Sequence, residues 1–86
     1  MSQLGQVRSQ VVSIGSDAKS TAAGLSAFRT KFSQAVGQVQ ATIGGTATGV
    51  DRQMIATLQA AEKQLESAVA ALQQASQAAN DWAARA

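Results

Sequence analysis

The fold of this chain is decided by the stretch Ile43-Gly44-Gly45-Thr46-Ala47-Thr48-Gly49-Val50-Asp51, the one cluster among its 86 residues with the composition of a loop. Glycines directly after Ile43 are typical of a helix C-terminus. Thr48 followed three residues later by Asp51 resembles a capping box, with Asp in place of Glu or Gln, and places negative charge in the first turn of a second helix. The turn motif is thus Ile43, Gly44 and Gly45. A single domain is predicted, with a helix over about 2–43, a turn over about 44–49 and a helix over about 50–85.

Apolar and small residues recur at alternating spacings of three and four on both sides of this turn. The first segment carries the row Leu4, Val7, Val11, Ile14, Ala18, Thr21, Leu25, Phe28, Phe32, Ala35, Val39 and Thr42. The second segment carries the row Met54, Leu58, Ala61, Leu65, Ala68, Leu72, Ala75, Ala79 and Trp82. A strand would need alternation with period two, which neither segment shows. The sequence therefore predicts an all-α fold, an antiparallel two-helix hairpin.

A second, shorter row of apolar residues lies one position further along the heptads. Its members are Val36, Ile43, Ile55 and Val69. Two rows make a face that is broader than a contact between two helices needs. Because each helix of a hairpin has one neighbour, one hairpin cannot cover both rows, and Leu4 and Val7 would face positions beyond the C-terminus if the turn centres near Ala47. We expect two hairpins to pair into a four-helix bundle; the alternative is a monomeric hairpin with a few exposed aliphatic side chains.

The amino-acid composition also favours association between two hairpins. Small domains usually supplement a modest core with disulfides, a structural metal or oligomerisation. The chain has no Cys and no His, so neither a disulfide nor the usual zinc sites can form, and no metal or cofactor is expected. The net charge is +2, and Arg8, Lys19, Arg29 and Lys31 are spread along the first helix rather than clustered. This pattern indicates solvation, not nucleic-acid binding.

Residues that could perform catalysis are few. Glu62 and Glu66 lie four apart beside Lys63, which we interpret as a solvated helix face, and Asp81 and Arg85 are spaced as an ordinary ion pair on one helix. No catalytic residue is assigned, and the prediction is a non-enzymatic protein. Two roles stay open for Trp82: closing the hairpin against Val11 and Val12, or anchoring a partner.

No stretch approaches the roughly 20 apolar residues of a transmembrane helix, so stable membrane insertion is not expected. The first residues lack the basic start and apolar core of a secretory signal. We expect synthesis in the cytoplasm without a signal peptide. A membrane-active amphipathic hairpin is disfavoured, because the polar positions carry Gln and Ser rather than Lys and Arg.

The layout of a helix, a short glycine-rich turn and a second Ala/Gln-rich helix resembles the WXG-motif family, the early-secreted-antigen-like substrates of type VII secretion systems. Ile43-Gly44-Gly45 stands where that family has Trp-x-Gly, so the glycine matches and Ile43 replaces the tryptophan. The segment from Gln40 to about Ala79 is similar to the family in length, residue types and heptad phase. The family's export signal is a tyrosine followed four residues later by an acid; Trp82 and Ala86 keep the aromatic residue and lose the acid.

The resemblance implies a protein that is exported folded, as a dimer of hairpins, by a type VII system. It implies a protein partner, either a second copy or a related hairpin, and the incomplete signal suggests the accessory half of a heterodimer or a targeting partner of a larger toxin. The alternative function is a structural, self-assembling helical bundle with no role in secretion.

Overall fold

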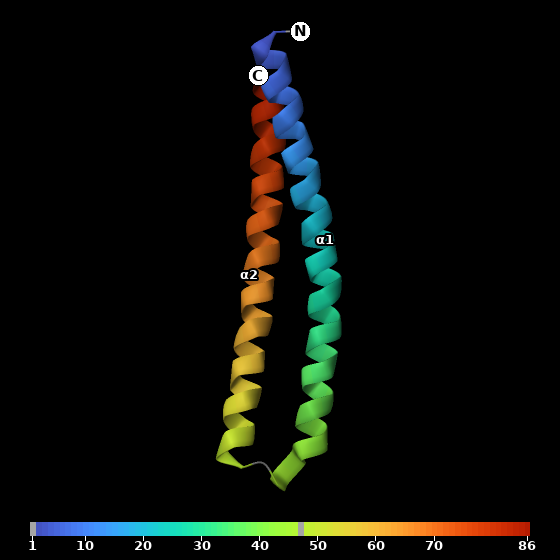
Figure 1. Cartoon of the computed structure of the whole chain (residues 1–86), viewed down its shortest axis with the longest axis vertical. Helices are drawn as coiled ribbons and strands as arrows, with labels where there is room; N and C mark the ends of the chain where they lie inside the picture. The colour runs from blue at the N-terminus through green and yellow to red at the C-terminus, as the bar shows by residue number, and fades with distance from the viewer. Residues whose placement is uncertain (1, 47) are drawn as a thin grey trace.

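In a computed structural model, the chain forms two long antiparallel helices joined by a short turn (Figure 1). Helix α1 spans Gln3–Ile43, the 3₁₀ turn η1 spans Gly44–Thr46, and helix α2 spans Gly49–Arg85. The structure describes residues 2–46 and 48–86, so Ala47, the expected centre of the turn, lies outside the described residues. The rod measures 66 × 17 × 15 Å, and the start of α1 lies beside the end of α2 at what we term the open end. The predicted all-α hairpin is confirmed.

Short-range hydrogen bonds define the ends of α1. The Gly5 N–H donates to the Ser2 hydroxyl over 3.1 Å, which satisfies one of the free donors of the first turn. At the other end the Gly44 N–H donates to the Gln40 carbonyl. Gly44 has φ 56° and ψ −140°, a backbone conformation that side-chain-bearing residues avoid. A glycine directly after Ile43 is therefore required to end α1 where it does.

The first turn of α2 is stabilised by the reciprocal capping box of Thr48 and Asp51. The Thr48 N–H donates to Oδ2 of Asp51 over 2.9 Å, and the Asp51 N–H donates to the Thr48 hydroxyl over 3.2 Å. The bond from the Thr48 backbone, followed by that from its side chain, lowers the pKa of the Asp51 carboxyl below its usual value of 3.8. The capping box therefore involves residues of a single turn, and it determines where α2 begins.

The two helices meet along one line of residues on each, which we call the seam; its members are half-buried or buried. On α1 the seam comprises Val11, Gly15, Ala18, Ala22, Leu25, Arg29, Phe32, Val36, Val39 and Ile43. On α2 it comprises Ile55, Leu58, Glu62, Leu65, Val69, Leu72, Ser76, Ala79 and Ala83. Both lists step by three and four, so a straight contact forms between helices that cross at a small angle.

The size of the seam residues sets the separation of the helices. Near the open end the seam holds Gly15 and Ala22 opposite Ser76 and Ala79, and a Cβ built on Gly15 would lie 3.0 Å from the Ala79 Cβ. Toward the turn the seam holds larger residues such as Phe32, and Figure 1 shows the two ribbons diverging there. The helices are therefore close where their side chains are small.

One detail of the heptad interpretation requires correction. The shorter row, with Val36, Ile43, Ile55 and Val69, lies inside the seam, while every second member of the longer α1 row lies outside it. Ile14 and Phe28 are exposed, because the residues that follow them, Gly15 and Arg29, turn toward α2 instead. The hairpin therefore covers the seam on each helix and leaves the members of the longer row outside the seam exposed.

Candidate interaction surface

The hairpin has a small core of its own. Among the described residues, the buried apolar side chains are Ala22 and Val36, with exposed fractions of 2% and 3%. Other seam residues are half-buried, because each helix is covered on one side only. A domain of this size gains little stability from so few buried side chains, so further apolar contact would stabilise it.

Large apolar side chains remain on one flank of the seam, at positions that directly precede its members. We call this surface the apolar face. On α1 it consists of Val7, Ile14, Thr21, Phe28, Ala35 and Thr42, and on α2 of Met54, Ala61, Ala68, Ala75 and Trp82. None of these side chains is charged. Ile14 is 62% exposed and Phe28 52%, and Val7, Met54 and Trp82 are also exposed.

The contributions of α1 and α2 lie on the same side of the rod. In an antiparallel pair, residues that precede the seam by one position in each helix flank the same side. Phe28 of α1 and Ala61 of α2 accordingly border one shallow hollow of about 400 Å³, with Phe32, Gln64 and Leu65. The Phe28 and Phe32 rings lie 5.9 Å apart, tilted by 35°. The apolar face is therefore continuous across both helices.

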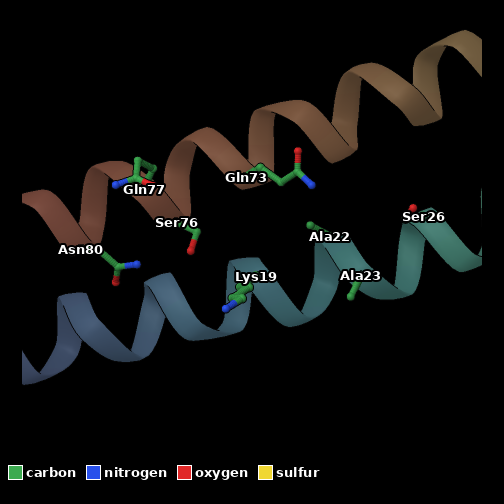
Figure 2. Close-up of a pocket in the computed structure, with 8 residues that line it drawn as sticks. All are labelled: Lys19, Ala22, Ala23, Ser26, Gln73, Ser76, Gln77 and Asn80. Atoms are coloured by element: carbon green, nitrogen blue, oxygen red, sulfur yellow. The ribbon is translucent and has the colours of Figure 1, made fainter.

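The opposite flank of the seam is polar. A hollow of about 420 Å³ is lined there by small and polar side chains, including Lys19, Ser26, Gln73 and Asn80. Figure 2 shows Ser76 and Asn80 of α2 extending toward α1 in this hollow. Val12 is the large apolar residue exposed at the start of this flank. The rod is thus two-sided, with one apolar and one polar flank.

Two polar contacts cross the middle of the seam, and sequence reasoning missed both. The Arg29 guanidinium forms an ion pair with Glu66, and the Ser33 hydroxyl donates to Oε2 of Glu62 over 3.0 Å. Arg29 Nε is buried without a hydrogen-bond partner. The prediction that Arg29, Glu62 and Glu66 lie on solvated helix faces without contacts between the helices is therefore wrong. The spacing of Arg29 between Leu25 and Phe32, at four and three residues, is the signal that could have placed it in the seam.

The predicted interface residues divide between the two surfaces. Those that lie in the seam are Val11, Leu25, Phe32, Val36, Val39, Ile55, Leu58, Leu65, Val69 and Leu72. Val7, Ile14, Phe28, Met54 and Trp82 lie on the apolar face, and Leu4 is exposed beyond the end of α2. Trp82 keeps 40% of its surface exposed, so a hairpin-closing role leaves much of its ring available. Asp81 accepts a hydrogen bond from Gln77 over 2.9 Å.

Over the described part of the chain, no three His, Cys, Asp or Glu side chains are grouped so that they could hold a metal ion. Neither helix, over the same residues, has a segment long and apolar enough to cross a membrane. What the geometry offers is an exposed apolar face that both helices contribute to. The chain matches no family model, and no curated protein or solved structure aligns with it.

Proposed function

We propose that this chain is a WXG-like substrate or partner protein of a type VII secretion system, and that it acts by helix–helix association through its apolar face. One observation carries the association: a hairpin with two buried apolar side chains among its described residues leaves a continuous apolar face across both helices. Contiguous exposed apolar surface of this kind is typical of sites where proteins bind each other.

The assignment to secretion is supported by the hairpin layout and by the turn Ile43-Gly44-Gly45. Gly45 stands at the place of the motif glycine, and Gly44, at the variable position before it, has the positive φ that ends α1. The capping box of Thr48 and Asp51 keeps the turn short, so the two helices stay antiparallel along their length. These features support a folded hairpin as the unit that is exported.

Export is tested by expressing the tagged full chain in a host with an intact type VII system and in the same host with the system inactivated. The expected result is accumulation in the medium only with the intact system, while a cytoplasmic marker stays inside the cells. Equal retention in both hosts would contradict the secretion role. It would favour the structural alternative, a self-assembling bundle that remains in the cell.

Dependence of export on the apolar face is tested with Ile14→Asp, and Val12→Asp is the matched control. Both residues are exposed aliphatics two positions apart, but Val12 lies on the polar flank. An unpaired charge in an apolar contact is costly, so Ile14→Asp should reduce export and Val12→Asp should not. Equal export of both variants would show that association through this face is not needed.

A further inference from the structure

The hollow on the polar flank contains a buried hydroxyl that no described residue binds. We call it the polar hollow, and its lining residues are Lys19, Ala22, Ala23 and Ser26 of α1 and Gln73, Ser76, Gln77 and Asn80 of α2 (Figure 2). Its volume of about 420 Å³ lies within the range of about 300–1,000 Å³ that is typical of small-molecule sites. The polar hollow and the apolar face lie on opposite sides of the seam, so a partner on that face leaves the hollow open.

Ser76 supplies this hydroxyl. It lies in the seam with 6% of its surface exposed, and its side chain makes no hydrogen bond within the described part of the chain. Figure 2 shows the hydroxyl directed from α2 toward α1, into the polar hollow. A buried hydroxyl without a partner destabilises a fold, and an alanine, as at the next seam position Ala79, would occupy the same place without that cost. The serine therefore points to a partner from outside the hairpin.

The register of the helices places Lys19 level with Ser76. Closer to the turn, Ser33 of α1 donates a hydrogen bond to Oε2 of Glu62 of α2 over 3.0 Å. A step of two heptads from that pair toward the open end leads to Lys19 and Ser76. These two side chains share no hydrogen bond, and both an ammonium and a hydroxyl can donate to one acceptor between them. The pair is thus suited to an anion.

The charges around the polar hollow favour an anion with a single negative charge. Lys19 is the one charged side chain among the eight that line it. Gln77 donates a hydrogen bond to Oδ1 of Asp81 over 2.9 Å, so a carboxylate of the protein lies just outside the hollow. One ammonium balances one carboxylate, whereas a doubly charged phosphate would be repelled more strongly by Asp81. The ligand chemistry that fits is a carboxylate.

Asn80 adds an amide group to the polar hollow because α1 has no side chain at Gly15. A Cβ built on Gly15 would lie 3.4 Å from Oδ1 of Asn80 and 3.5 Å from the carbonyl oxygen of Ser76. The glycine therefore lets the Asn80 side chain extend toward α1 in the same hollow as Lys19 (Figure 2). An amide both donates and accepts, so it can bind a second polar group of the ligand.

We propose that the polar hollow binds a small carboxylate-bearing molecule, whose carboxylate pairs with the Lys19 ammonium and accepts a hydrogen bond from the Ser76 hydroxyl. The amides of Gln73 and Asn80 bind a polar group next to the carboxylate, such as an amide. This site goes beyond the proposed role in secretion and does not depend on the apolar face, so its failure would leave that role intact.

Binding is tested with N-acetylglycine, which joins a carboxylate to an amide, by titrating it into the isotope-labelled full chain and recording NMR spectra. The expected result is saturable shifts of the backbone amide signals of Lys19, Ser76 and Asn80. N-acetylglycinamide, an uncharged molecule of similar shape, should bind about tenfold more weakly, because its hydrogen bonds lack the charge. Inorganic phosphate should also bind more weakly. Shifts that do not saturate would mean nonspecific ion binding only, and tighter binding of phosphate would exclude the carboxylate; either result would overturn the inference.

Ser76→Ala separates a serine that binds a ligand from one that stabilises the fold. It should raise the dissociation constant of N-acetylglycine about tenfold, because it removes a hydrogen bond to a charged group. The melting temperature should stay the same or rise, because the hairpin loses no hydrogen bond. Ser67→Ala, at an exposed position of α2, is the control and should leave the dissociation constant unchanged. A Ser76→Ala variant that unfolds more easily and binds N-acetylglycine like the wild type would show a structural role and overturn the inference.

Lys19→Met tests the charge. It should raise the dissociation constant of N-acetylglycine about two- to fivefold, since Lys19 is exposed and solvent screens its charge. Lys31→Met is the matched control, because it removes an exposed lysine of α1 that does not line the polar hollow. Equal effects of the two substitutions would reveal general attraction of anions to a basic protein and would overturn the inference.

Discussion

The hydroxyl of Ser33 in α1 donates a hydrogen bond of 3.0 Å to Oε2 of Glu62 in α2, so a polar contact joins the helices in the middle of a largely apolar seam. The Arg29–Glu66 ion pair lies one turn away. Polar contacts at defined seam positions penalise shifted registers, because a shift leaves the polar groups without partners. The two pairs together hold the register of the two helices.

Ser33→Ala should lower the free energy of unfolding by about 0.5–1.5 kcal/mol, the net contribution of one hydrogen bond. Ser20→Ala, at an exposed position on α1, supplies the control for the change in helix propensity. Urea denaturation followed by circular dichroism measures both variants. Equal stabilities of the two variants would mean that the Ser33–Glu62 bond contributes nothing.

Glu66→Gln should cost less than about 1 kcal/mol, because the Arg29 and Glu66 side chains are 39% and 51% exposed and solvent screens the pair. Arg29→Met should leave the stability unchanged or raise it, since it removes a buried Nε that has no hydrogen-bond partner and keeps an apolar stem in the seam. Denaturation at low and high salt measures these effects. A loss above about 2 kcal/mol for Arg29→Met would show that the ion pair is a major stabilising contact.

Gly15→Ala and Gly37→Ala should differ in their effect on the stability of the fold, although both residues lie inside α1. Nothing lies within 4 Å of a Cβ at Gly37, so the alanine should add about 0.5–1 kcal/mol through helix propensity alone. At Gly15 the new methyl would lie 3.0 Å from the Ala79 Cβ and 3.5 Å from the Ser76 carbonyl oxygen. The helices must separate there, so Gly15→Ala should be less stable than Gly37→Ala in thermal unfolding. Equal gains would mean that the close approach at Gly15 relaxes freely.

The capping box should make stability depend on pH. The folded-state pKa of Asp51 is lowered from 3.8 by its bonds to Thr48, so the unfolded state binds the proton more readily. The stabilisation from the Asp51 carboxylate is complete above pH 3.8, the ordinary pKa of the group. It is lost as the pH falls below 3.8 and passes through the lowered pKa of the folded state. Asp51→Asn should flatten the fall in melting temperature over this window. A profile unaltered by Asp51→Asn would contradict the assignment.

Phe28→Asp should abolish the proposed assembly while leaving the hairpin largely helical, because the ring is exposed in the single chain and association through the apolar face would cover it. Phe32→Asp should reduce both assembly and helicity, since this side chain is half-buried in the seam. Light-scattering mass on a sizing column and circular dichroism of the same sample separate the two effects. Wild-type mass for Phe28→Asp would exclude the apolar face as the contact surface.

The sequence by itself determined the elements whose causes are local. The glycine at position 44 ends α1 through a positive φ, and Thr48 and Asp51 start α2 through bonds within a single turn. Heptad spacing determined that the helices pack lengthwise. These features depend on residues a few positions apart, so no knowledge of the partner helix is needed to predict them.

The tertiary structure alone decided which rows face inward. Leu25 and Phe32 can form a seam with either Phe28 or Arg29, since both choices keep spacings of three and four. Arg29 is the one that lies in the seam, for two reasons. Gly15 and Ala22 let α2 approach closely on this side of α1. Arg29 pairs with Glu66 there, and Ser33 donates a hydrogen bond to Glu62. That selection depends on contacts between residues far apart in the chain. It leaves Ile14, Phe28 and Trp82 together on one exposed face.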